Sequence, residues 1–143
     1  RDYAARQLAH AFACGAPGRF QIEAAIQQVH MARKDSGVTD WDALNRLYHA
    51  LIGLAPSAGA LVAQAVVTAR VHGARAGLDA LARIEPGVGA QMQALWAARA
   101  DMLSEAGDAV GARAAYHKAM SLAAEPPLAA FLQGRADALP ASG

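Results

Sequence analysis

The stretch Trp96-Ala-Ala-Arg-Ala-Asp-Met-Leu-Ser-Glu-Ala-Gly-Asp-Ala-Val-Gly-Ala-Arg-Ala-Ala-Tyr116 decides the fold of this 143-residue chain. It predicts two helices joined at Gly107 and Asp108, because glycine commonly ends a helix and aspartate caps the start of the next. Alanine is the best helix former and has a small side chain, so two alanine-rich helices can cross closely. The rings of Trp96 and Tyr116 then fill the space between them, which makes this stretch a helical hairpin.

A second copy of the pattern occurs earlier in the chain. Gly73–Leu81 resembles Gly111–Ala119, which lies 38 residues further along, and both stretches run on to a Glu-Pro pair, ending at Pro86 and Pro126. A period of this size is typical of helix-hairpin repeats, in which each unit buries its apolar face against the next.

The stronger copy resembles the tetratricopeptide repeat. Its expected repeat core consists of Trp96, Gly107, Ala112, Tyr116 and Ala119, which fall at relative positions 4, 15, 20, 24 and 27 of that repeat. Arg99 stands where the repeat usually has leucine and Ala100 where it has glycine, so we describe the hairpin as tetratricopeptide-like.

Apolar residues recur with a helical period along the whole chain, and no segment alternates apolar and polar residues as a strand does. The sequence predicts an all-α fold, an antiparallel array of about eight helices forming one domain, 1–143. This domain comprises N-terminal helices (1–55), repeat-like hairpins (56–139) and a frayed tail (140–143). The predicted helices span about 2–13, 19–34, 41–55, 58–72, 74–84, 88–106, 109–122 and 127–139.

The composition limits the core and the partners. Hydrophobic residues make up 55% of the chain, but roughly a quarter of all positions are alanine, so a few large side chains must supply core volume. Those expected to do so are Phe20, Trp41, Tyr48, Trp96, Tyr116 and Phe131. The net charge of +1 and the dispersed arginines argue against a nucleic acid or an anionic membrane as partner. The single cysteine, Cys14, and the absence of a secretory leader or membrane span in the sequence indicate a cytoplasmic protein.

A wider resemblance covers nearly the whole chain in order. Gly18–Ile26, Val29-His30, Thr39–Trp41, Leu47-Tyr48, Leu54–Ser57, Ala65-Val66, Gly77-Leu78, Ala97–Ala100, Ala115-Tyr116 and Phe131-Leu132 carry it. These segments resemble the carboxy-terminal helical extension of bacterial extracytoplasmic-function (ECF) sigma factors. The chain departs from that family at Ala63-Gln64, where an Asn-Arg pair is usual. The resemblance implies a non-catalytic regulatory domain that follows two DNA-binding sigma domains and acts on them or on RNA polymerase in transcription initiation.

The candidate interface comprises Phe20, Gln21, His30, Trp41, Tyr48 and Arg99, aromatic and polar residues of the kind that contact surfaces use. Two alternatives stay open at this stage. Trp41 and Tyr48 could belong to the core instead. Arg99 could form a surface ion pair with Asp101 or Glu105, or be buried with another partner.

No pattern of catalytic, cofactor-binding or metal-ligating residues is present. The histidines His10, His30, His49, His72 and His117 fall on five different predicted helices, and none has a second ligand at metal-binding spacing. Gly107–Gly111 lacks the lysine and the preceding strand of a phosphate loop. The chain is therefore not expected to be an enzyme. The rival functions are a free-standing tetratricopeptide-like adaptor that binds a peptide, and a sensor that holds a small apolar ligand.

The charge pattern predicts that the isolated chain has no measurable affinity for duplex DNA, because dispersed arginines displace few counterions. Fluorescence anisotropy with a labelled duplex at two salt concentrations measures this. A salt-dependent complex with micromolar affinity would contradict the prediction.

Overall fold

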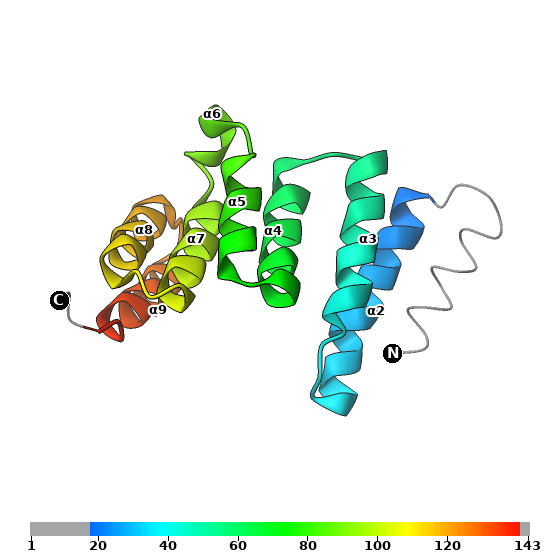
Figure 1. The fold of residues 1–143 in the computed structure, drawn as a ribbon, viewed down its shortest axis with the longest axis horizontal. Helices are drawn as coiled ribbons and strands as arrows, with labels where there is room; N and C mark the ends of the chain where they lie inside the picture. The colour runs from blue at the N-terminus through cyan, green and yellow to red at the C-terminus, as the bar shows by residue number, and fades with distance from the viewer. Residues whose placement is uncertain (1–17, 141–143) are drawn as a thin grey trace. The chain divides into compact units, whose positions relative to one another are not determined.

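The computed structural model describes residues 18–140, and within them the chain forms helices and no strand (Figure 1). The helices are α2 (Arg19–Ser36), α3 (Trp41–Leu54), α4 (Ala58–His72), α5 (Ala74–Ala82), α6 (Pro86–Gly89), α7 (Gln93–Glu105), α8 (Ala109–Leu122) and α9 (Pro126–Asp137). The all-α prediction is confirmed. The predicted helix at 2–13, Cys14 and residues 141–143 of the predicted tail lie outside the described residues.

The chain divides into two compact units, Arg1–Val67 and Thr68–Gly143, and the boundary falls within α4. Each unit is built on its own set of packed helices: α2 packs against α3 in the first, and α7 packs against α5 and α8 in the second. The single-domain organisation over 1–143 stays a prediction.

In the first unit, α2 and α3 form an antiparallel hairpin (Figure 1). Each helix buries one apolar stripe at helical spacing, which consists of Ile22, Ala25, Ile26 and Val29 on α2 and of Ala43, Leu44, Leu47 and Leu51 on α3. Gly37 ends α2 in the left-handed conformation (φ 73°), which glycine adopts without steric cost. The Asp40 carboxylate then accepts a hydrogen bond from the Ala43 amide and starts α3.

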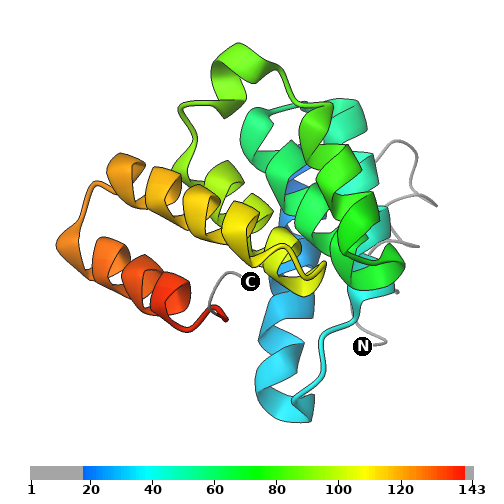
Figure 2. The ribbon, with the colours of Figure 1, turned by 60° about the vertical axis from the view of Figure 1, so that its left-hand side comes forward.

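In the second unit, α7, α8 and α9 pack in sequence, and Figure 2 shows α8 beside α9 with the two running in opposite directions. Gly107 (φ 90°) turns the chain after α7. The Asp108 carboxylate accepts a hydrogen bond of 2.8 Å from the Gly111 amide and caps α8. The predicted turn of the hairpin therefore forms with the chemistry that the sequence indicates.

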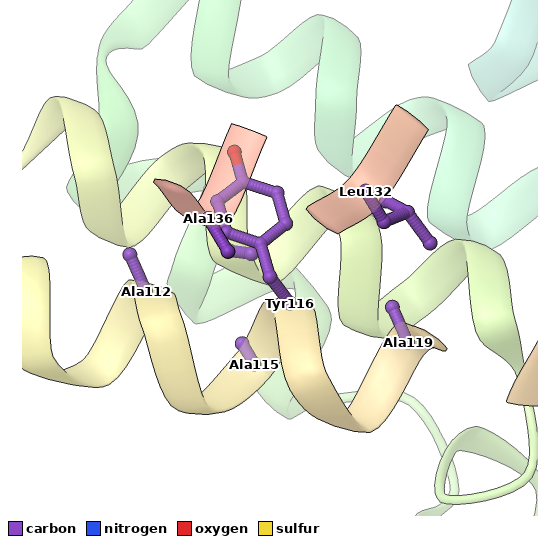
Figure 3. Close-up of a cluster of buried hydrophobic side chains, with 7 residues drawn as sticks. Ala112, Ala115, Tyr116, Ala119, Leu132 and Ala136 are labelled. Carbon is purple, nitrogen blue, oxygen red and sulfur yellow. The ribbon is translucent and has the colours of Figure 1, made fainter. Parts of the chain in front are cut away.

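Tyr116 of α8 lies at the centre of a core of small side chains and is only 2% exposed. Its ring lies beside Leu132 and Ala136 of α9 (Figure 3). The rest of this core is alanine, namely Ala100 from α7 and Ala112, Ala115 and Ala119 from α8, and Trp96 packs against its edge. One ring thus supplies much of the volume where three helices meet.

Two of the six large side chains expected in the core are exposed instead, so that prediction is wrong for Phe20 and Phe131, which are 80% and 60% exposed. Phe20 precedes Ile22 by two residues, about 200° around the helix, and so points away from the buried stripe of α2. Phe131 lies beside the buried Leu132 but about 100° away from it on α9. Of the others, Trp41, Tyr48 and Trp96 are half-buried, and only Tyr116 is fully buried.

The predicted helix at 88–106 is also wrong at its start, because α7 begins at Gln93 and a separate single turn, α6, precedes it. Glu85 caps this turn, its carboxylate accepting a hydrogen bond from the Gly87 amide. Glycine at 87 and 89 weakens any continuation of the helix, and Met92 adopts an extended conformation (φ −96°, ψ 110°) before α7. The other described helices begin and end within two residues of the predicted bounds.

We expect Tyr116→Ala to lower the free energy of unfolding by about 3–5 kcal/mol, because it removes a buried ring that α9 and the alanines of α7 and α8 surround. Urea denaturation followed by circular dichroism measures this. Phe131→Ala is the matched control, since it removes an exposed ring and is expected to change stability by less than about 1 kcal/mol. Equal effects of the two substitutions would contradict the assignment.

Candidate functional site

The outward side of α2 carries exposed apolar residues along three turns. Phe20, Ala24, Gln27 and Met31 all point away from the buried stripe, because each lies about 140–200° from Ile22 around the helix. All four are exposed, and the exposed fractions of Phe20 and Met31 are 80% and 54%. We call this set the outer α2 face. Phe20 and Met31 stand at the two ends of this face, about 16 Å apart along the helix, and offer a partner protein two apolar contact points on one side of α2.

A groove adjoins this face within the first unit. It has a volume of about 480 Å³, and Ile26, Leu51 and Ala60 form its apolar part, while Glu23, Gln27, Tyr48, Ser57, Gly59 and Ala63 complete the lining. Gln27 belongs both to the groove and to the outer α2 face. Burial raises the pKa of the Tyr48 phenol above its usual 10.0, so the phenol stays protonated and can donate a hydrogen bond. The groove thus combines apolar and polar side chains, as protein-contact surfaces do.

The structure brings only part of the candidate interface together. Phe20 lies on the outer α2 face, Tyr48 lines the groove, and Trp41 is half-buried at the first residue of α3. Arg99 belongs to α7 in the second unit. The candidate residues thus do not form one surface within either unit.

Gln21 and His30 lie on opposite sides of α2, since nine residues correspond to two and a half turns. The Gln21 side-chain oxygen also accepts a hydrogen bond of 2.9 Å from the Gly18 amide and caps α2. Gln21 therefore stabilises the start of its own helix. His30 is exposed, one residue before Met31.

Sequence reasoning missed Met31 and Gln27. Their spacing is the signal that could have found them. Gln27 follows Phe20 by seven residues and Met31 follows Gln27 by four, which places all three on the side of α2 opposite the main apolar stripe.

In the second unit, polar groups from three helices meet at the outer edge of Tyr116. Its hydroxyl donates a hydrogen bond to the Asp101 carboxylate of α7. Arg135 of α9 pairs with the same carboxylate through Nη2 at 2.9 Å, and its Nε donates to the Tyr116 oxygen at 3.2 Å. These hydrogen bonds and the ion pair tie α7, α8 and α9 together. Within residues 18–140, no buried side-chain polar atom lacks a hydrogen-bond partner.

One of the alternatives left open for Arg99, an ion pair with Asp101, does not form, because residues two apart on a helix point in different directions. Asp101 pairs instead with Arg135, 34 residues away. The Arg99 guanidinium lies 5.9 Å from the centroid of the Trp96 ring.

The network keeps the Tyr116 phenol protonated. Burial is the main cause that raises its pKa above 10.0, and the hydrogen bond to Asp101 raises it further, while Arg135 opposes both. A catalytic tyrosine base or nucleophile needs the opposite shift. The arrangement thus favours a structural role for Tyr116.

The described part of the chain contains no cluster of three or more histidine, cysteine or acidic side chains placed to hold a metal ion. The Nδ1 atom of His49 lies 2.9 Å from the side-chain nitrogen of Gln64. The other described histidines lie on three different helices: His30 on α2, His72 on α4 and His117 on α8. His10 lies outside the described residues. Among residues 18–140, none of the helices has both the length and the apolar character needed to cross a membrane.

We expect Tyr116→Phe to lower the free energy of unfolding by about 1 kcal/mol at neutral pH, because Asp101 and Arg135 are half exposed and water can replace the lost hydroxyl. The folded-state pKa of Tyr116 is raised, so its stabilising contribution is complete below pH 10.0 and is lost as the pH rises through the folded-state value. The variant should therefore lose less stability than the wild type above pH 10.0. Urea denaturation across the alkaline range tests this, and identical alkaline losses would contradict it, because Tyr48 titrates in both proteins.

No protein-family model matches the chain, and no solved structure matches it. Over 128 residues, or 87% of its length, the chain is 34% identical to an uncharacterized protein of Rhizobium meliloti (strain 1021). The chain spans only 29% of that relative. Residues similar to this chain therefore make up one segment of a much longer bacterial protein.

Proposed function

We propose that this chain is a non-catalytic, regulatory C-terminal module of a bacterial ECF sigma factor, acting in the cytoplasm. In this proposal the outer α2 face and the adjoining groove contact the sigma domains of the same parent chain or RNA polymerase. The observation that carries the proposal is the position of Phe20 and Met31, which are exposed on the side of α2 opposite the core. Truncating one of the few side chains that dominate a protein interface costs more than about 1 kcal/mol.

Three further observations support the proposal. The segments that resemble the ECF extension run in order from Gly18 to Leu132, and they form an all-helical chain of the kind that resemblance implies. More than two thirds of the Rhizobium relative lies outside the match, which leaves room for two additional domains in that protein. The low net charge of +1 also fits a protein partner better than DNA.

The alternative is a free-standing tetratricopeptide-like adaptor, which the close α7–α8 hairpin favours. The coding sequence upstream of Arg1 distinguishes the two functions: the gene of a sigma factor would encode two helix-rich basic domains there, and the gene of an adaptor would not. A sensor for a small apolar ligand is less well supported, because the groove beside α2 is open and carries polar groups at its edge.

The test uses the parent factor and transcription from its own promoter. Deletion of residues 1–143 should change the transcription rate. Phe20→Ser combined with Met31→Ser should change it in the same direction by about fivefold or more, the effect of losing about 1 kcal/mol of contact free energy. Both residues are exposed, so the double variant should fold normally.

Val110→Ser is the matched control, because Val110 is another exposed apolar residue (59%) but lies on α8. It should leave transcription unchanged. Deletion without any effect would dismiss a regulatory role, whereas an effective deletion with a silent double variant would reject only the outer α2 face.

A further inference from the structure

A small apolar pocket lies between α5, α6 and α7, within the second unit. Its volume is about 240 Å³, and most of its lining is aliphatic or aromatic, from Leu81, Ile84, Pro86, Leu95 and Trp96. Arg99 is the one charged residue in the lining. The pocket is thus an apolar depression with a cation beside it.

The irregular segment that precedes α7 shapes this pocket. The Trp96 indole donates a hydrogen bond of 3.1 Å to the Ala90 carbonyl oxygen, which fixes the ring against the chain after α6. Gly89 approaches Leu95 so closely that a Cβ there would lie 2.9 Å from the leucine Cδ1. These two contacts hold the walls in place, so the pocket exists before any ligand arrives.

Arg99 is half-buried, and its guanidinium lies 5.9 Å from the centroid of the Trp96 ring. The structure gives it no ion pair or hydrogen bond to another side chain within residues 18–140, in contrast to Arg135, which pairs with Asp101. A guanidinium partly shielded from water pairs strongly with a carboxylate, because both groups are charged and can form two parallel hydrogen bonds. The charge of Arg99 therefore complements an anionic ligand that also carries an apolar group.

The volume argues for a side chain as the occupant. Small-molecule and cofactor sites usually measure about 300–1,000 Å³, and this pocket is smaller. We propose that it binds a peptide segment of a partner protein in which an aliphatic side chain, such as leucine, stands next to an aspartate or glutamate. The aliphatic group fills the space between Leu81 and Trp96, and the adjacent carboxylate pairs with Arg99.

This site is independent of the outer α2 face, since it belongs to the other unit. The inference holds for a sigma-factor module and for a free-standing adaptor alike. A negative result for the outer α2 face in the transcription test therefore leaves the peptide-binding test of this pocket unaffected, and the reverse also holds.

The test titrates the full chain with the blocked peptides acetyl-Leu-Glu-amide and acetyl-Leu-Gln-amide, and it follows the indole N–H resonances by NMR. We expect the Trp96 resonance to shift and saturate with acetyl-Leu-Glu-amide, while the Trp41 resonance of the same molecule stays unchanged. The dissociation constant should rise about tenfold for acetyl-Leu-Gln-amide and for the Arg99→Gln variant, because each change removes one charge of the pair. Arg75→Gln is the matched control, an exposed arginine of α5 outside the pocket lining, and it should bind as the wild type does.

Three results would overturn the proposal. One is the absence of any shift at Trp96, and another is equal affinity for the two peptides. The third is tighter binding of hexanoate than of acetyl-Leu-Glu-amide, which would assign the pocket to a small aliphatic acid. Urea denaturation is the folding control: the midpoint of Arg99→Gln should equal that of the wild type, so that a loss of binding does not reflect a loss of folding.

Discussion

The close approach of α7 and α8 over alanine is the constraint on which the second unit depends. Ala100, Ala112 and Ala119 are fully buried, so nothing larger separates the two helices at these positions. One large ring, Tyr116, then fills the junction with α9, and its hydroxyl joins Asp101 and Arg135 at the surface. Dispersion contacts increase with packing density, so small side chains stabilise this core by allowing close approach.

Large apolar side chains also lie on the surface of both units. Phe20 and Met31 of α2 and Phe131 of α9 are exposed, whereas Tyr116 of α8 is buried. On α2 the exposed residues lie beside a groove lined by apolar and polar side chains, which is the physical basis for proposing a protein contact there. At Tyr116, burial and the hydrogen bond to Asp101 raise the pKa of the phenol, and its polar neighbours join three helices, which favours a structural role.

Local chemistry made much of the fold predictable. Asp108 caps the helix that the sequence assigns to it, and Gly107 adopts the left-handed conformation that the predicted turn requires. The expectation of Phe20 in the core is wrong because its phase relative to Ile22 places it on the opposite side of α2, where it stays a candidate interface residue. The pairing of Asp101 with Arg135 spans 34 residues and depends on how three helices pack, so no local pattern contains it. The pocket beside Arg99 follows from the irregular chain around α6, where helix periodicity gives no information.

The most direct test of this account compares Ala112→Leu with Ala114→Leu by urea denaturation. Leucine is nearly as good a helix former as alanine, so the difference between the two variants reports on packing. Ala112 is fully buried, whereas Ala114, two residues further along the same helix, is exposed. The account predicts that Ala112→Leu lowers the free energy of unfolding by about 1–3 kcal/mol and that Ala114→Leu changes it by less than about 0.5 kcal/mol. Equal stabilities of the two variants would contradict the claim that close packing over alanine holds this unit together.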